Sequence, residues 1–357
     1  MIIQKLALRN YRSYDAVDLT FEKGLNVIIG ENAEGKTNIV EAIHYLSLAR
    51  SFRTSEDNAL IKENREFTTI EAEVAEGPLK KRIIVSLTPN GKKVTSNGKP
   101  ISRLSELSTL VNVVVFEPAH VALFKDSPKA RRDFLDISLT KQSISYLEQI
   151  SKYEKILRER NEVLKKEPIN SLQLETVTEM LIATAEKIVR YREMYIQQIN
   201  KVLSQIVASI KGAKEIAKIK YLPFVKPDAE FKTNAKTAFS KALEGDLRKK
   251  VTSIGPHRED FKMTLNGKDV AKYGSQGENR VLALALTLSP YFLIEDKDKR
   301  PIIALDDVMS ELDEEHKERL ISFLRRFEQV FITSTALEVS DACLYEVRNH
   351  KIARRNS

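Results

Sequence analysis

The sequence predicts an α/β protein built on a mixed sheet, with a long and mainly helical insertion. Three observations lead to this expectation. A G-x-x-x-x-G-K-T stretch at residues 30–37 lies between a short apolar run and a helical pattern. Alternating polar and apolar residues with hairpin turns follow over residues 67–115. Two long helical patterns then fill residues 138–210 before an apolar strand pattern returns near the C-terminus.

The N-terminal residues show strand patterns that lead into the glycine-rich stretch. Val17, Leu19 and Phe21 alternate with polar residues, and Lys23-Gly24 turns the chain into an apolar run at residues 25–29. A short, mainly apolar run of this kind indicates a buried strand. Strand, glycine-rich turn and helix therefore follow in the order that a phosphate-binding P-loop requires.

A P-loop predicts a site for a nucleoside triphosphate. Its expected binding residues are Gly30, Glu31, Asn32, Ala33, Glu34, Gly35, Lys36, Thr37 and Asn38. Backbone N–H groups of such a turn surround phosphate oxygens, and the N-terminus of the next helix adds partial positive charge. We expect Lys36 to reach the β- and γ-phosphates and the Thr37 hydroxyl to bind Mg²⁺. The alternative is an ordinary glycine-rich turn.

The middle of the chain changes from strand patterns to helical ones. Hairpin signals at Asn90-Gly91 and Asn97-Gly98 beside a P-loop favour a mixed sheet. Ser127-Pro128 is a typical N-cap and first-turn pair for a helix. Two amphipathic patterns follow, separated by a break at residues 167–170, and predict a helical hairpin or short coiled-coil arm. A further helix is expected over residues 239–250.

An apolar run at residues 302–305 ends in Asp306-Asp307, which is the pattern of a Walker B strand. We expect Asp306, with Thr37, to hold Mg²⁺, and Asp307 to polarise the attacking water. Lys36, Asp306 and Asp307 are therefore the expected catalytic residues. The alternative is a strand followed by a solvated acidic turn.

Two shorter motifs flank this strand. Ser275, Gln276 and Gly277 precede an apolar helical pattern, where a hydroxyl and backbone N–H groups can face an anion. Ser310-Glu311-Leu312-Asp313 follows Asp307 and, taken alone, is a capping-box-like helix start. Arg12 follows the first strand pattern, and we expect it near the nucleotide.

Composition narrows the class of protein. The chain has 357 residues, enough for two domains or one domain with a large insertion, and a net charge of +8. Positive charge is compatible with nucleic acid but equally with a solvated basic surface. The single cysteine, Cys343, excludes an intrachain disulfide. The N-terminus lacks a signal-peptide pattern, and the longest apolar stretch is interrupted by polar residues and proline, so we expect a cytoplasmic protein without a membrane span.

Taken together, the motifs resemble the RecF family of bacterial recombination mediators, which belongs with the SMC/Rad50-like ABC-type ATPases. The resemblance runs nearly end to end. It is carried by residues 10–14 (NYRSY), 30–38 (GENAEGKTN), 116–118 (FEP), 127–136 (SPKARRDFLD), 255–260 (GPHRED), 274–277 (GSQG) and 305–313 (LDDVMSELD).

The resemblance implies a fold and a function. The fold would be an ABC-type ATPase lobe at residues 1–116 and 285–357, with a helical second lobe at 117–284 that bears the signature motif. Residues 275–277 of one subunit would contact the γ-phosphate of ATP bound to another, which gives an ATP-dependent homodimer. Residues 310–313 would be the D-loop. The activity would be weak, DNA-stimulated ATP hydrolysis with Mg²⁺. The partners would be double-stranded DNA, single-strand/double-strand junctions, RecR and RecO, in a pathway that loads RecA.

Two residues depart from related patterns. Relatives often carry Gln where this chain has Glu278, and a carboxylate near the γ-phosphate would repel it. Many transport ATPases carry Glu where this chain has Asp307, and the shorter side chain offers a reason for slow hydrolysis. Basic residues that could contact DNA are Lys80, Lys81, Arg82, Arg131, Arg132, Lys187, Arg190, Arg192 and the tail at 348–355.

Two other functions remain open from the sequence. An energy-coupling ATPase subunit for transport would share the P-loop and Walker B motifs, although the long arm and the split nucleotide site argue against it. An SMC-like DNA tether would need longer arms, because helices at 1.5 Å per residue give roughly 60 Å or less here.

Overall fold

The computed structural model describes residues 1–101, 106–212, 214–310 and 312–355, which form two compact units. Unit 1 contains residues 1–121, 205–214 and 280–357, and unit 2 contains residues 122–204 and 215–279. The expected lobe boundaries did not include the short return of the chain to unit 1 at residues 205–214. Within the described residues, no helix is both long and apolar enough to cross a membrane.

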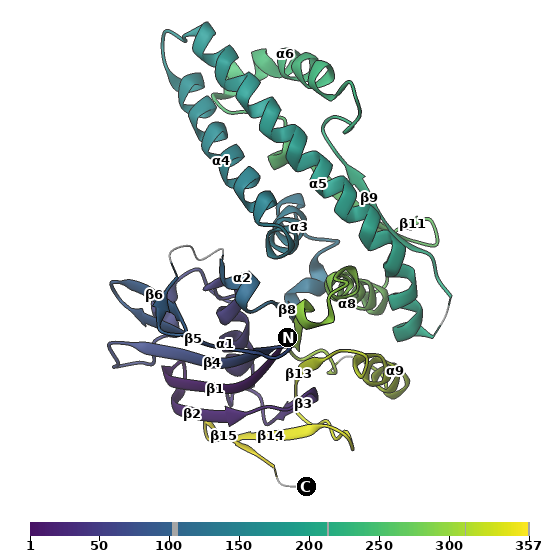
Figure 1. The fold of residues 1–357 in the computed structure, drawn as a ribbon. Helices are drawn as coiled ribbons and strands as arrows, with labels where there is room; N and C mark the ends of the chain where they lie inside the picture. The colour runs from purple at the N-terminus through teal and green to yellow at the C-terminus, as the bar shows by residue number, and fades with distance from the viewer. Residues whose placement is uncertain (102–105, 213, 311, 356–357) are drawn as a thin grey trace. The chain divides into compact units, whose positions relative to one another are not determined.

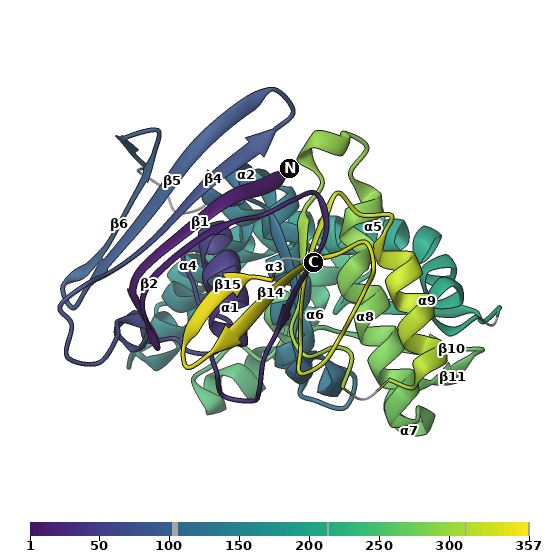
Figure 2. The same cartoon turned by 90° about the horizontal axis from the view of Figure 1, so that it is seen from below.

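Unit 1 contains two six-stranded sheets (Figure 1). The first is antiparallel throughout and has the order β2-β1-β4-β5-β6-β7; its strands from β2 to β6 are labelled in Figure 2. Its strands are β1 (Ile2–Tyr11), β2 (Tyr14–Thr20), β4 (Thr68–Glu76), β5 (Leu79–Thr88), β6 (Gly91–Ser96) and β7 (Lys99–Pro100). The expected turns at Asn90-Gly91 and Asn97-Gly98 join β5 to β6 and β6 to β7.

The second sheet is mixed, as the sequence predicted, and has the order β15-β14-β3-β13-β12-β8. All neighbouring strands are parallel except β14 and β15. Its strands are β3 (Gly24–Ile29), β8 (Val113–Phe116), β12 (Ile302–Leu305), β13 (Gln329–Ser334), β14 (Cys343–Arg348) and β15 (Lys351–Arg354). The carboxyl ends of β3 and β12 therefore lie at the same edge of the sheet, where ligands bind in such folds.

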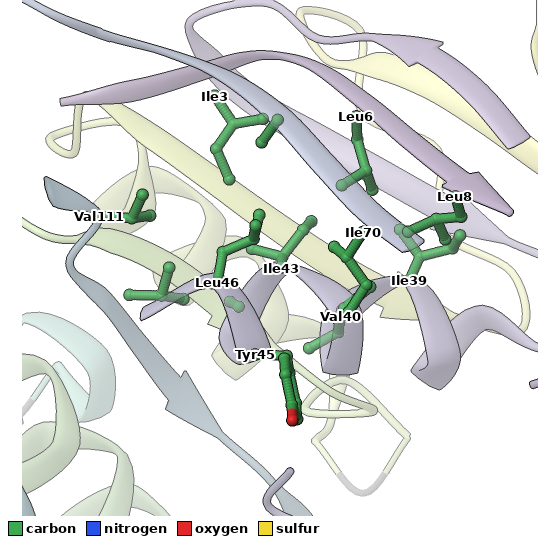
Figure 3. Packing of buried hydrophobic residues seen from close by; sticks show 14 of the residues in the cluster. Ile3, Leu6, Leu8, Ile39, Val40, Ile43, Tyr45, Leu46, Ile70 and Val111 are labelled. Atoms are coloured by element: carbon green, nitrogen blue, oxygen red, sulfur yellow. The ribbon is translucent and has the colours of Figure 1, made fainter. Parts of the chain in front are cut away.

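Helix α1 (Lys36–Leu48) packs against strands of both sheets and is buried on nearly all sides. Ile39, Ile43 and Leu46 of this helix meet apolar residues of β1 and β4 (Figure 3). The remaining helices of unit 1 are α2 (Leu107–Leu110), the end of α5, most of α8 (Gln276–Leu293) and α9 (Glu314–Leu324). Burial of α1 fixes the P-loop, which immediately precedes it.

Unit 2 is mainly helical and carries a three-stranded antiparallel sheet of order β11-β10-β9. Its helices are α3 (Pro128–Gln142), α4 (Ile144–Lys165), most of α5 (Ser171–Lys211), α6 (Phe231–Lys249) and α7 (Val270–Tyr273), and its strands are β9 (Ala217–Leu222), β10 (Asp260–Leu265) and β11 (Lys268–Asp269). Ser127 caps α3 by accepting a hydrogen bond from the Ala130 N–H at 3.3 Å, which confirms the predicted helix start.

The two long helical patterns are α4 and α5, and the break between them falls where it was predicted. The sequence placed the next helix too late. It begins at Phe231 rather than residue 239, because Phe231, Ala235 and Phe239 are all buried at helical spacing.

Buried arginines hold unit 2 together. Arg160 of α4 donates to the Asp246 carboxylate of α6 at 2.8 Å, and both side chains are buried. Arg192 of α5 contacts Asp136 of α3 and Glu259, each at 2.9 Å. A buried ion pair of this kind is costly to break from one side, because the other charge is left unpaired.

Candidate nucleotide-binding site

The P-loop leaves β3 at Gly30 and enters α1 at Lys36. Gly35 has a φ of 110° and Ala33 a φ of 69°, so the loop turns through the left-handed region twice. A Cβ atom on Gly30 would lie 2.6 Å from the Val347 carbonyl oxygen of β14, so only glycine permits this approach. Residues Glu31, Asn32 and Ala33 are exposed at the tip of the loop. The motif therefore has the strand, turn and helix context that the sequence predicted.

The Lys36 ammonium group lies within its own loop. Its Nζ donates to the carbonyl oxygens of Gly30 and Glu31, both at 2.7 Å. Burial lowers the pKa of Lys36, while the negative charges of Asp307, Asp306 and Glu34 oppose that change. A buried cation inside a ring of backbone groups is suited to bind the oxygens of a phosphate chain.

Thr37 and Asp306 meet at the base of the loop. The Thr37 hydroxyl donates to Asp306 Oδ1 at 2.9 Å, and its distance to Oδ2 is 3.1 Å. Adjacent ligands in an octahedral Mg²⁺ shell, with Mg–O distances near 2.1 Å, lie about 3 Å apart. The two residues that the sequence assigned to Mg²⁺ thus have the separation that neighbouring positions around this ion require.

Asp306 is held in place from the other side by Thr333 of β13. The Thr333 hydroxyl donates to Asp306 Oδ1 at 2.7 Å and accepts from the Asp307 N–H at 2.9 Å. Burial raises the pKa of Asp306, and the hydrogen bonds from Thr333 and Thr37 counteract that effect. Asp307 adopts a φ of 49°, which is unusual for a residue other than glycine and turns the chain sharply after the strand.

Two further charged residues lie near this site, and the sequence motifs assigned neither of them a role there. Glu117 follows β8, and burial together with the nearby Asp306 raises its pKa to about 7. Arg53 donates to Asn38 Oδ1 at 2.9 Å, and its positive charge lowers the pKa values of Asp306 and Glu117. Glu117 belongs to the 116–118 stretch that contributes to the family resemblance, and Arg53 belongs to none of the quoted stretches. Only the fold shows that both are neighbours of the P-loop.

Arg12 lies in the turn after β1, where Glu41 of α1 binds its guanidinium group. Nε and Nη2 donate to the buried Glu41 carboxylate at 2.9 and 2.6 Å, and Nη1 donates to the Ala59 carbonyl oxygen at 2.8 Å. The neighbouring Tyr14 hydroxyl donates to the Gly35 carbonyl oxygen at 3.1 Å. Arg12 thus contacts the helix that follows the P-loop.

Ser275, Gln276 and Gly277 are exposed at the start of α8, in unit 2. Glu278 forms a capping box with Ser275: its carboxylate accepts from the Ser275 N–H at 2.8 Å, and its own N–H donates to Ser275 Oγ at 3.2 Å. Asn279 donates to the carbonyl oxygens of Gly274 and Ser275 at 3.1 and 2.7 Å. The Glu278 carboxylate is therefore already hydrogen-bonded to the Ser275 N–H, a group that could otherwise donate to an incoming anion. Glu311 of the expected D-loop lies outside the described residues.

Several basic residues proposed for DNA contact are engaged by carboxylates. Arg192 is 1% exposed and cannot contact DNA in this conformation, so that expectation was wrong. The reason is that Asp136 and Glu259 neutralise it within unit 2. Arg131 makes a two-point contact with Asp260 at 2.7 and 2.8 Å. Comparable pairs are Lys81 with Glu76, Arg82 with Glu71, Arg190 with Glu186 and Arg348 with Glu346.

Comparisons with known proteins identify the family. The RecF/RecN/SMC N-terminal domain family matches residues 2–352. The DNA replication and repair protein RecF of Halalkalibacterium halodurans is 37% identical over 372 residues, which cover 99% of this chain and 100% of that protein. The protein of the same name from Bacillus subtilis is 36% identical over 372 residues with the same coverage.

Solved structures show the same relationship. A structure of the recombination mediator protein RecF with ATP in the RecFOR pathway has a TM-score of 0.89 and 32% sequence identity, and covers 99% of this chain and 97% of that chain. An Smc head domain from Pyrococcus furiosus has a TM-score of 0.60 and 18% identity, covering 99% of this chain and 96% of that one. At this identity the second likeness concerns the fold alone.

Proposed function

Because the chain belongs to the RecF family and shares its ABC-type ATPase fold, we propose that it is an ATP-switched DNA-binding protein of replication and recombinational repair. The observation that carries the proposal is the convergence of Lys36, Thr37 and Asp306 at the carboxyl ends of β3 and β12. A P-loop site uses this lysine, hydroxyl and carboxylate for a nucleoside triphosphate and its Mg²⁺.

In this proposal, the residues of unit 1 bind ATP and hydrolyse it slowly. Residues 30–38 surround the phosphates, and Lys36 turns from its own loop carbonyls to the β- and γ-phosphates. Thr37 and Asp306 hold Mg²⁺, which neutralises charge on the phosphates when it is bound. Asp307 orients the attacking water. Its side chain is shorter than that of a glutamate, and the backbone at this residue turns away from the strand direction. The carboxylate therefore reaches less far toward the water, and hydrolysis is slow.

ATP also joins two copies of the chain. Residues 275–277 of one subunit contact the γ-phosphate that the P-loop of the other subunit holds, so the nucleotide site is complete only in a two-fold dimer. Their exposure at the N-terminus of α8 supports this role, because the positive end of the helix dipole favours a negative charge. Hydrolysis of the γ-phosphate removes the link and releases the dimer.

The dimer is the form that binds DNA. We propose that it closes on double-stranded DNA and on single-strand/double-strand junctions at gaps, mainly through the phosphate backbone, and therefore with steep salt dependence and little sequence preference. With RecR and RecO it then promotes loading of RecA in the cytoplasm. The relation to the solved RecF structure described in the RecFOR pathway supports these partners.

The test is the mass of the full chain by light scattering with ATP, with ADP and without nucleotide, each with and without a gapped duplex. We expect a dimer with ATP, which the gapped duplex stabilises further. With ADP or without nucleotide we expect a monomer. The variant Lys36→Met is expected to remain a monomer with ATP. A wild-type chain that binds ATP and stays monomeric at all concentrations and with DNA would contradict the switch.

A further inference from the structure

The C-terminal hairpin of β14 and β15 lies against the P-loop at two points. One is the close approach of Gly30 to Val347 described above. The other is His350, at the turn of the hairpin. We propose that His350 is a positioning residue for the P-loop, which orients the peptide between Glu34 and Gly35 toward bound phosphate. This inference rests on the proposed ATP binding and adds a residue that lies outside both nucleotide motifs.

The hairpin is placed by the sheet. β14 pairs with β3 in parallel, and Glu346 stands opposite Ile29, the last residue before the P-loop. The turn that follows β14 therefore lies beside the loop that follows β3. Asn349 and His350 have φ values of 49° and 56°, the left-handed conformation that two-residue hairpin turns use. The turn geometry thus brings His350 to the loop.

Two hydrogen bonds join His350 to Glu34. The ring Nδ1 lies 3.0 Å from the Glu34 carbonyl oxygen, and the His350 N–H donates to Glu34 Oε2 at 3.1 Å. A carbonyl oxygen has no proton, so Nδ1 is the donor in the first bond. One residue of the hairpin therefore binds both the main chain and the side chain of a single P-loop residue.

Peptide geometry links this contact to phosphate binding. The peptide unit is planar and trans, so its C=O and N–H point in opposite directions. When His350 holds the Glu34 carbonyl toward the hairpin, the Gly35 N–H must face away from it, as a phosphate-binding turn requires. The next carbonyl, that of Gly35, is also held: it accepts from the Tyr14 hydroxyl at 3.1 Å and from the Asn38 N–H at 3.0 Å. Two successive peptides are thus fixed from outside the loop.

The test uses variants of the turn that keep its backbone conformation. His350→Gly removes the ring and accepts the positive φ without strain. His350→Asn keeps an N–H donor near the position of Nδ1 and also tolerates this φ. Asn349→Gly is the matched control, because it changes the other left-handed residue of the same turn. Thermal unfolding of each variant shows whether the fold is retained.

We expect His350→Gly to raise the Kd for ATP about fivefold, the effect of one hydrogen bond of ordinary strength. The KM should rise by a similar factor with little change in kcat, because the phosphates are held alike in the ground and transition states. His350→Asn should recover most of the affinity, and Asn349→Gly should match the wild type.

The outcomes separate this inference from the proposed function. If the wild type binds ATP and His350→Gly binds it equally well, His350 does not position the loop. Equal weakening by His350→Gly and His350→Asn would also overturn the inference, because the donor would then be irrelevant. If the wild type itself binds no ATP, the proposed function fails and the inference fails with it.

Discussion

The hydroxyl of Thr37 lies 2.9 Å from a carboxylate oxygen of Asp306, although 269 residues separate them in the chain. Parallel strands produce this contact, because β3 and β12 flank β13 and end at one edge of the sheet. Unit 2 is built entirely from residues between these two positions, so one half of the site precedes unit 2 in the chain and the other half follows it.

The carboxylate of Asp306 should be needed for Mg²⁺ and not for ATP itself. We expect Asp306→Asn to bind ATP without metal about as well as the wild type, because the amide keeps the hydrogen bond from Thr333. Hydrolysis should fall about 100-fold through loss of metal-assisted charge stabilisation. Nucleotide binding with and without Mg²⁺, together with phosphate release, checks both statements. Asp341→Asn, which changes an exposed carboxylate of the same unit, should have neither effect.

The adjacent Asp307 is expected to act on the water and not on the nucleotide. Asp307→Asn retains a side chain that tolerates the observed φ of 49° but removes the charge. Turnover should fall at least tenfold while the Kd for ATP stays within about twofold. Lys36→Met, which should abolish both turnover and ATP binding, is measured beside this variant to test the role assigned to Asp307. Unchanged turnover in Asp307→Asn and in Asp307→Ala would show that another group orients the water.

Arg53 should support the chemical step by placing a cation close to the carboxylates of the site. Its side chain is 43% exposed and lies 3.6 Å from the Glu41 carboxylate, a long ion pair that we expect a bound γ-phosphate to replace. We expect Arg53→Ala to lower turnover about tenfold with a smaller effect on the Kd for ATP, and Arg53→Lys to recover part of the rate. Arg50→Ala is the control, since Arg50 is an exposed arginine three residues away. Equal rates for the two alanine variants would contradict the prediction.

Glu278 is expected to weaken the ATP-dependent dimer. Its carboxylate accepts from the Ser275 N–H. In the proposed dimer this negative charge would lie near the γ-phosphate bound to the other subunit. Glu278→Gln can keep the capping bond without the charge, so the dimer dissociation constant with ATP should fall about tenfold. Sedimentation of both proteins over a concentration series measures it. A weaker dimer in Glu278→Gln would show that the carboxylate has a favourable role.

His257 should make unit 2 sensitive to acid. Burial, together with the positive charges of Arg258 and Arg132, lowers its pKa from the ordinary 6.5 to about 4. Between these values the unfolded chain binds a proton that the folded chain does not, so stability is full above pH 6.5 and decreases as the pH falls toward 4. Protonation of His257 should lower the free energy of unfolding by up to about 3 kcal/mol.

Urea unfolding followed by circular dichroism at pH 7 and pH 4.5 measures this loss. In His257→Gln the free energy of unfolding should decrease less between pH 7 and pH 4.5 than in the wild type, whatever the variant's stability at pH 7. His316→Gln changes a histidine of unit 1 that is 29% exposed, and it should keep the wild-type decrease. An equal decrease in all three proteins would assign the acid sensitivity to other groups.

Much of the nucleotide site could be predicted from sequence, because its parts are local patterns. The P-loop needs a strand, a turn and a helix in direct succession, and residues 25–48 supply them. The Walker B strand is an apolar run ending in two aspartates. Each pattern lies within a few residues, so the sequence identifies it without knowledge of the fold.

The rest depends on contacts between distant segments. Thr333 and His350 contribute to the site only because β13 and β14 lie on either side of β3. Arg192 is a residue that the sequence assigned wrongly to a DNA-binding surface. On a helix with many charged residues it resembled a surface residue, whereas carboxylates from two other segments make its burial possible. A charged residue is expected at the surface when only the sequence is known, and its burial becomes evident only once its ion-pair partners are located in the fold.

The strand order also has a consequence for synthesis of the chain. β3 carries the P-loop, yet both of its neighbours in the sheet, β13 and β14, come from residues 329–348. While the ribosome is still making the preceding 300 or so residues, the P-loop strand has nothing to pair with on either edge. Nucleotide binding is therefore a property that a nascent chain acquires at the very end of translation, and a chain that stops before residue 329 should never acquire it.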